Sequence, residues 1–215
     1  EFVKRFKAIY AEVYGTGAVT NNSSLTPAIT ERHLHRVENY IQDAQAKGAR
    51  VEWMAEDAPL DLQNRRRPMR LVINAPKDAL ICQEEIFGAA ASVQSYRDIK
   101  EVVAEIQKGE YPLALYYFGK DKAEEEYVLQ NTLSGGVVVN DVLLHAAMND
   151  APFGGVGASG MGRYNGKEGF LEFSHHRIIY RAGWWDPQRK MGLKPPFTDP
   201  KKTMDTIIQG LKSPI

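Results

Sequence analysis

The order of predicted elements between residues 113 and 140 constrains the fold more than any other feature. Apolar residues at 113–118 predict a strand, residues 121 to 133 have the pattern of a helix, and residues 136–140 predict a second strand. A strand, a helix and a strand in this order normally form a parallel pair with a crossover connection. The chain therefore belongs to the α/β class, and the absence of an internal repeat excludes a solenoid.

Two amphipathic helices are predicted ahead of this unit. The first has apolar residues at helical spacing within residues 2–13 and is expected to stop at Gly15. After a loop, the second has its buried stripe within residues 34–44, with Thr30 as the N-cap and Gly48 as the stop. Three short strands and a helix are then predicted, at residues 50–53, 70–74, 90–96 and 99–106.

Composition and charge exclude several classes of protein. Lys and Arg number 27, as do Asp and Glu, so no net field attracts nucleic acid or an anionic membrane. No apolar run reaches the roughly 20 residues that cross a bilayer, and the first residues do not resemble a signal peptide. A single cysteine excludes an internal disulfide and fits a reducing compartment. We therefore expect a cytoplasmic protein with no nucleic-acid or membrane partner.

The histidines and clustered arginines do not predict a further site. His33 and His35 are two residues apart, which places them on different faces of a helix, and the pair at 175–176 has no cysteine or carboxylate at ligand spacing. We expect no metal site. The arginines within residues 65–70 are too local for a nucleic-acid surface, and we predict that they lie in a solvated loop.

Two sequence blocks carry a resemblance to a known family. They are QEEIFG at residues 83–88 and PFGGVGASGMG at residues 152–162, with YPLALYYFGKD and SGGVVVNDVLLH between them. In this order the blocks resemble the aldehyde dehydrogenase superfamily over residues 1–182. The segments PLALYYF, GGVVVND and FSHHR are most similar to the corresponding segments of the coniferyl aldehyde dehydrogenases. The resemblance implies a three-layer, parallel-sheet catalytic domain with a C-terminal oligomerisation strand and tail.

The resemblance implies a cofactor contact at the first block. Glu85 corresponds to the family's glutamate that holds the nicotinamide ribose hydroxyls, and Phe87 to the aromatic residue beside the nicotinamide. A carboxylate can accept two hydrogen bonds from a vicinal diol, and an apolar ring can bound a flat cofactor ring. Without the other blocks, Glu84 and Glu85 would be interpreted as a solvated pair and Phe87 as core. The family places proline where this chain has Ala89, which gives this loop more backbone freedom.

The second block implies a substrate channel. Phe153 resembles the aromatic wall of the family's aldehyde tunnel, and His145 is a candidate for its entrance together with Leu144 and Met148. The alternative is ordinary packing, since large apolar residues are usually buried. The glycines at 154–162 lack the preceding strand and following acidic residue of a dinucleotide fingerprint, so we interpret them as structural.

The principal catalytic groups are expected outside this chain. Aldehyde oxidation in the family uses a thiolate nucleophile, oxyanion donors and a general base. The resemblance puts the nucleophile and the base upstream of Glu1, so no catalytic residue is assigned here. We predict that Cys82 is a buried small hydrophobe and not a nucleophile.

The C-terminal region is expected to extend beyond the catalytic domain. We divide the chain into a partial catalytic domain at 1–175, an oligomerisation strand at 176–183 and an extension at 184–215, which ends in an amphipathic helix. A strand that pairs across a subunit boundary predicts a homodimer. A disordered tail is the alternative for the extension.

Three functional hypotheses follow. The first is the C-terminal part of an NAD- or NADP-dependent aldehyde dehydrogenase, acting on an aldehyde of coniferaldehyde type. This fragment would be inactive alone and would not bind the cofactor tightly. The second is a naturally short, non-catalytic homologue that acts as a binding or oligomerisation module. The third, an independent dinucleotide-binding module, lacks the expected phosphate-binding loop.

Overall fold

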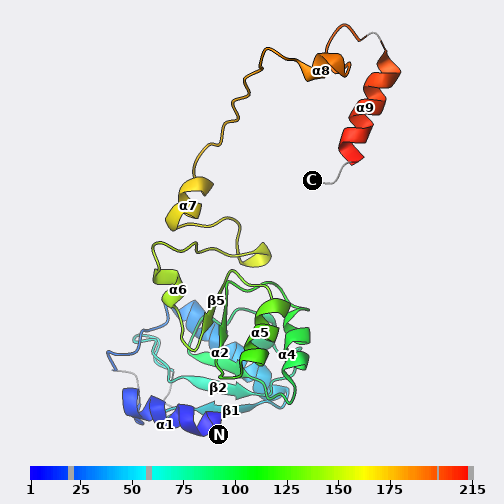
Figure 1. Ribbon diagram of the computed structural model, residues 1–215. Helices are drawn as coiled ribbons and strands as arrows, with labels where there is room; N and C mark the ends of the chain where they lie inside the picture. Colours follow the sequence, from blue (N-terminus) through cyan, green and yellow to red (C-terminus); the bar gives the residue numbers. More distant parts are fainter. Residues whose placement is uncertain (19–21, 57–59, 198, 213–215) are drawn as a thin grey trace. The chain divides into compact units, whose positions relative to one another are not determined.

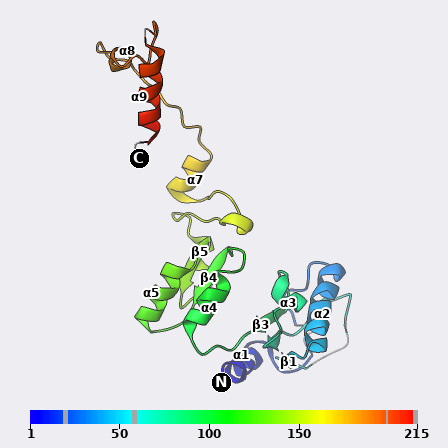
Figure 2. The same ribbon diagram turned by 90° about the vertical axis from the view of Figure 1, so that its right-hand side faces the viewer.

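A computed structural model describes residues 1–18, 22–56, 60–197 and 199–212. The chain divides into two compact units, which are described separately. The first unit contains Glu1–Gly109 and Glu126–Thr132, and the second contains Glu110–Glu125 and Leu133–Ile215. The ribbon is shown in Figure 1 and, turned by 90°, in Figure 2. Within the described ranges, no helix combines the length and hydrophobicity that a membrane span requires.

The first unit is built on a three-stranded sheet with the order β1-β2-β3. Strand β2 (Arg70–Ile73) runs antiparallel to β1 (Arg50–Trp53) and parallel to β3 (Ala90–Val93). The predicted strands are therefore confirmed, although the third ends at Val93 and not at residue 96. The mixed directions mean that β2 and β3 are joined by a crossover, while β1 is an antiparallel edge strand.

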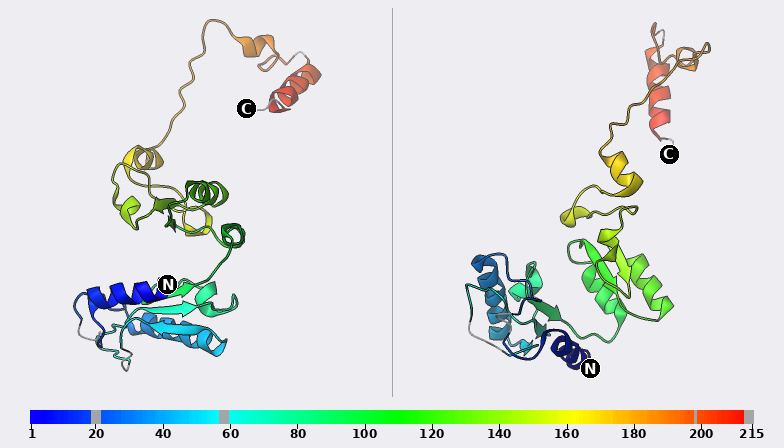
Figure 3. Two further views of the ribbon diagram at one scale, coloured as in Figure 1. Left: turned by 60° about the horizontal axis from the view of Figure 1, so that its bottom comes forward. Right: turned by 90° about the vertical axis from the view of Figure 1, so that its left-hand side faces the viewer.

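Helices α1 (Phe2–Tyr14) and α2 (Glu31–Ala46) lie on opposite faces of this sheet (Figure 3). Successive side chains of a strand point to opposite faces, so Leu71 joins a core cluster with Tyr10 of α1 and Val72 joins one with Val37 of α2. Both residues are fully buried. The first unit thus has three layers, helix, sheet and helix, as predicted.

The ends of α2 are set by local chemistry. Thr30 has an extended backbone, and its Oγ1 accepts a hydrogen bond from the backbone N–H of His33, 3.3 Å away. This is the contact expected of an N-cap. At the other end Gly48 has φ +92°, a left-handed conformation that favours glycine. Helix α1 likewise ends at Tyr14, before Gly15 with φ +83°. The predicted boundaries of both helices are confirmed. Of the loop predicted after α1, residues 19–21 lie outside the described ranges.

The strand, helix, strand unit predicted from the sequence is confirmed. Strand β4 (Ala114–Tyr117) pairs in parallel with β5 (Gly136–Val139), and α5 (Lys122–Asn131) forms the crossover between them. The boundary between the two units falls within α5. Helix α4 (Ile99–Ile106), which precedes β4, begins at an Asp98 N-cap and buries Val103.

Short elements follow β5 in the second unit. They are α6 (Leu144–Ala147), the 3₁₀ turn η1 (Gly157–Ser159), α7 (Gly166–Glu172), α8 (Pro187–Lys190) and α9 (Pro200–Lys212). The amphipathic helix predicted at the end of the chain is α9. The oligomerisation strand predicted at residues 176–183 has no regular secondary structure in this single chain, and Ile178 is 92% exposed. A strand requires a ladder partner, and no described strand pairs with this segment.

The prediction that the arginines at 65–70 lie in a solvated loop is wrong. Arg70 is 1% exposed and its Nη1 lies 2.6 Å from Oε1 of Glu38 on α2, while Arg67 Nε lies 3.2 Å from the same oxygen. Both guanidinium groups also lie over the Trp53 ring, 5.0–5.1 Å from its centroid. Arg70 belongs to β2, so the sheet carries it inside the unit and Glu38 compensates its charge.

The prediction that Cys82 is buried is also wrong. Cys82 is an exposed free thiol in α3 (Leu80–Gln83), a helix of four residues. One turn of helix can direct only part of its circumference inward, and here Ile81 is the residue it buries. The Cys82 Sγ lies 3.6 Å from the hydroxyl of Ser92 on β3.

Candidate functional site

The QEEIFG loop begins at the end of α3, and α2 fixes that helix. The Asp43 carboxylate of α2 accepts a hydrogen bond from the backbone N–H of Leu80, 2.7 Å away. This hydrogen bond lowers the pKa of Asp43 below its ordinary value, with a smaller contribution from Lys47. Because a negative charge is favourable at a helix N-terminus, Asp43 stabilises the start of α3 and so the position at which the loop leaves it.

Helix α2 also holds the loop itself. The guanidinium of Arg36 donates hydrogen bonds from Nη1 to the carbonyl oxygen of Glu85 and from Nη2 to that of Ile86, the latter at 2.9 Å. Gly88 lies so close to α2 that an added Cβ would be 2.6 Å from Cγ2 of Val37. The loop therefore contacts two successive residues of α2.

The anchored loop presents the two predicted cofactor residues to solvent. Phe87 has a φ of +41°, which is rare for a bulky residue, and its side chain is 74% exposed. Glu85 is also exposed, and its carboxylate makes no hydrogen bond or ion pair with any residue that the structure describes. A free carboxylate and an uncovered apolar ring thus stand two residues apart on one fixed loop.

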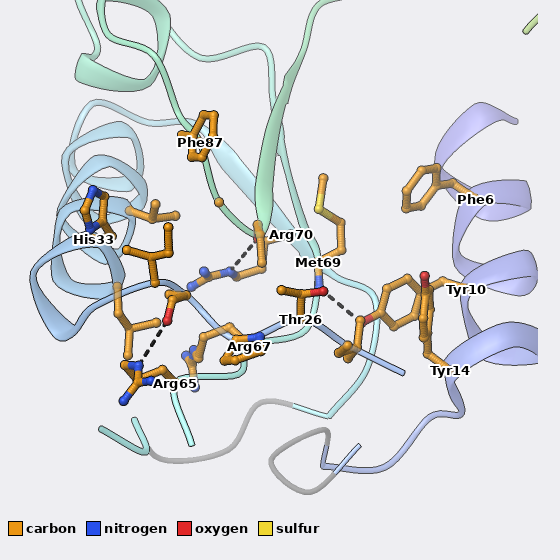
Figure 4. A pocket seen from close by; sticks show the side chains of 18 residues that line it. Phe6, Tyr10, Tyr14, Thr26, His33, Arg65, Arg67, Met69, Arg70 and Phe87 are labelled. Carbon is orange, nitrogen blue, oxygen red and sulfur yellow. Dashed lines mark hydrogen bonds between the residues drawn. The ribbon is translucent and has the colours of Figure 1, made fainter. Parts of the chain in front are cut away.

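Phe87 lies at a pocket of about 590 Å³ in the first unit (Figure 4). Aromatic residues of α1, including Phe6 and Tyr10, line one side, and His33 of α2 lies on another. Arg67 and Arg70 also reach its wall, and the lining residues include no carboxylate. The Tyr10 hydroxyl accepts a hydrogen bond from the Met69 N–H, and burial raises the pKa of Tyr10. The pocket is apolar and aromatic, with cationic groups at its wall.

In the second unit the structure brings the other two predicted residues together. The rings of His145 and Phe153 meet edge to face, with centroids 5.3 Å apart. Tyr116 of β4 flanks His145 on one side and Tyr164 flanks Phe153 on the other. Both ring nitrogens of His145 are shielded from solvent and have no hydrogen-bond partner among the described residues. His145 therefore supports Phe153 by ring packing.

The glycines of the second block have the structural role that the sequence predicts. A Cβ on Gly154 would lie 2.2 Å from the carbonyl oxygen of Gly162, and one on Gly155 would lie 2.2 Å from that of Ser159. Phe153 and Tyr164 close this turn with backbone hydrogen bonds of 2.8 and 2.9 Å. The close approach of main chain to main chain explains the glycines without a bound phosphate.

Sequence reasoning missed Arg36, the residue that holds the first block. Its position on α2 gave no signal, because its acceptors are main-chain carbonyls about 50 residues away. Glu85 and Phe87 belong to the first unit, and His145 and Phe153 to the second. The structure thus groups the four predicted residues into two pairs. Among the residues described, no group of three His, Cys, Asp or Glu side chains is placed to hold a metal ion.

Known proteins resemble this chain in fold and in sequence. A solved structure of the substrate-bound state of Staphylococcus aureus AldH aligns over 98% of this chain and 43% of its own, with a TM-score of 0.73 and 27% identity. Betaine aldehyde dehydrogenase of the same organism, solved in complex with NAD+, aligns over 68% of this chain and 29% of its own, with a TM-score of 0.60 and 30% identity. The probable coniferyl aldehyde dehydrogenase of Caulobacter vibrioides is 41% identical over 198 residues.

The α/β fold of this chain is that of the solved dehydrogenase structures that align with it. The chain belongs to the aldehyde dehydrogenase family, whose profile matches residues 1–179. The Caulobacter relative is matched over 91% of this chain but only 40% of its own length. The chain therefore spans less than half the length of the relatives it matches.

Proposed function

We propose that this chain is the C-terminal part of an NAD- or NADP-dependent aldehyde dehydrogenase that oxidises an aldehyde to its carboxylic acid. The observation that carries the proposal is the anchored QEEIFG loop, which presents an unpaired Glu85 carboxylate and an uncovered Phe87 ring. The 41% identity to a probable coniferyl aldehyde dehydrogenase supports an aromatic aldehyde of coniferaldehyde type as substrate.

The residues present fit a nicotinamide dinucleotide. Glu85 offers two acceptor oxygens to a ribose diol, and Phe87 offers a flat apolar face to a ring. When bound, the dinucleotide supplies a hydride acceptor. The loop's own task is to orient that acceptor, because correct geometry removes much of the entropic cost of the reaction. The left-handed backbone conformation of Phe87 turns its ring outward, where it can contact the nicotinamide ring.

The second unit would supply the wall of the aldehyde channel. Phe153 offers its ring to an aromatic substrate, while His145 positions Phe153 from behind. The thiol nucleophile and the general base belong upstream of Glu1 in this proposal, so the chain alone is expected to be inactive and to bind the dinucleotide weakly. Intact-mass measurement and sequencing of the protein from its source cells would test this, and a native chain beginning at Glu1 would refute it.

The proposed enzyme is a homodimer in the cytoplasm. We assign residues 1–175 to the partial catalytic domain, 176–183 to an oligomerisation strand and 184–215 to a C-terminal extension. The unpaired segment at 176–183 supports a homodimer, since pairing would satisfy its backbone groups and cover Ile178. A cytoplasmic location fits the single free thiol.

Changing Glu85 to glutamine should raise the Michaelis constant of the dinucleotide or slow hydride transfer by about tenfold, because hydrogen bonds to a charged acceptor weaken when the charge is lost. The measurement is steady-state and single-turnover kinetics of the full-length polypeptide that carries this sequence. Glu84→Gln is the matched control, since Glu84 is the adjacent exposed carboxylate without an assigned role. Unchanged kinetics for the Glu85 variant, or equal losses in both variants, would refute the assignment of Glu85.

A further inference from the structure

We propose that Arg36 is the positioning residue of the QEEIFG loop, and that through it α2 sets where Glu85 and Phe87 stand toward the dinucleotide. The part of this inference that concerns the dinucleotide rests on the proposed function. The part that concerns the loop rests on the contacts of Arg36 alone. Arg36 touches neither substrate nor cofactor in this proposal, and it acts only through the loop backbone.

The two hydrogen bonds of Arg36 suit a guanidinium and no other side chain. Its terminal nitrogens Nη1 and Nη2 donate to two successive carbonyl oxygens, those of Glu85 and Ile86. A planar fork of donors fixes both the distance and the orientation of two acceptors, whereas an ammonium group acts as a point charge. Two peptide planes of the loop, directly before Phe87, are thereby held against α2. We call this pair of hydrogen bonds the clamp.

Arg36 is itself held in place from its own helix. Its Nη1 lies 3.3 Å from the Tyr40 hydroxyl one turn further on, and its guanidinium carbon lies 5.3 Å from the centroid of the Tyr40 ring. Tyr40 is buried in the core cluster formed by α2 and the sheet. A cation over an aromatic face is attracted to it. Tyr40 therefore favours the Arg36 rotamer that reaches the loop, even before Arg36 forms its hydrogen bonds to the loop carbonyls.

The loop needs such a restraint because its conformation is unfavourable by itself. A left-handed backbone at a bulky residue such as Phe87 costs about 1–3 kcal/mol and persists only where the surroundings enforce it. Gly88 and Val37 limit the loop on one side by close packing. The hydrogen bonds of Arg36 to the two preceding carbonyls hold the loop to the same helix, so Phe87 is left with the outward-facing conformation.

Proteolysis of the 215-residue chain tests the clamp without any cofactor. An endoprotease that cleaves after glutamate has sites at Glu84 and Glu85, within the clamped backbone, and a reference site at exposed Glu110. Arg36→Ala should speed cleavage at the loop relative to Glu110 by about tenfold, since cleavage follows the population of the open loop. Arg36→Lys should give a smaller increase, because it restores one donor but not the fork.

Arg32→Ala is the matched control for this test. Arg32 lies one turn earlier on the same helix, is exposed, and has no partner among the residues described. Its variant should cleave like the unaltered chain. If Arg36→Ala behaves like Arg32→Ala, or if it speeds cleavage at Glu110 as much as at the loop, the clamp is overturned.

Kinetics of the full-length polypeptide separate the clamp from the proposed function. Arg36→Ala should change the dinucleotide Michaelis constant or the hydride-transfer rate in the same direction as Glu85→Gln, and the double variant should lose less than the product of the two effects, because contacting groups couple. If the double variant instead loses the full product of the two single effects, Arg36 does not act through Glu85. If Glu85→Gln is silent while the proteolysis result holds, the proposed role of Glu85 toward the dinucleotide fails and the clamp remains.

Discussion

Replacing Glu38 with alanine should lower the free energy of unfolding of the first unit by about 3–5 kcal/mol, the usual cost of removing one member of a buried ion pair. The Glu38 carboxylate lies 2.6 Å from Arg70 and 3.2 Å from Arg67, and Arg70 is 1% exposed. Without Glu38, the two guanidinium groups beside Trp53 would lose the carboxylate that they share. We expect the unit to open or admit water there, since arginine does not lose its proton.

Urea unfolding followed by Trp53 fluorescence measures this effect, with Trp184 and Trp185 replaced by phenylalanine so that Trp53 alone reports. Glu52→Ala is the control, because Glu52 pairs with Arg50 at 3.5 Å and the Arg50 side chain is 67% exposed. A pair exposed in this way should contribute less than about 1 kcal/mol. Equal losses for the two variants would show that Glu38 does not compensate a buried charge.

Replacing Gly155 with alanine should destabilise the glycine-rich turn by about 3 kcal/mol. The new Cβ would lie 2.2 Å from the Ser159 carbonyl oxygen and 2.5 Å from the Gly160 nitrogen, and both atoms are main chain that no rotamer change can move. The turn must then open. The backbone hydrogen bonds between Phe153 and Tyr164 should break more often as a result.

Hydrogen exchange of the Phe153 and Tyr164 amides, followed by NMR, measures this opening. A loss of about 3 kcal/mol corresponds to exchange faster by more than about 100-fold. Gly183→Ala is the control, since a Cβ there meets nothing within 4 Å. Unaltered protection of the two amides in the Gly155 variant would contradict the steric account of the turn.

The elements that could be predicted from sequence are those whose signal is local. The apolar periodicity of α1 and α2, the Thr30 cap and the order of β4, α5 and β5 each depend on neighbouring residues. The strand expected at 176–183 has no ladder partner among the described residues, and because the expected partner is another subunit it stays a prediction. The family resemblance, and not the pattern of any segment, pointed to Glu85, Phe87, His145 and Phe153.

The parts that could not be predicted depend on distant residues. Arg70 is buried because Glu38, 32 positions earlier, reaches it from α2. Nothing in the run of arginines indicates this partner. Arg36 was missed for a related reason, since every residue offers the main-chain carbonyl that it recognises. Cys82 was expected inside because cysteine is commonly buried, but a one-turn helix has no period from which to judge its outward face.

The exposed thiol of Cys82 makes this chain convenient for spectroscopy. The chain has one cysteine, so a maleimide dye or a spin label would attach at a single position without any engineered substitution. That position lies in α3, immediately before the QEEIFG block that begins at Gln83. A label there would report loop opening in real time, and its signal in the Arg36 variants could be followed under conditions where no enzymatic turnover occurs.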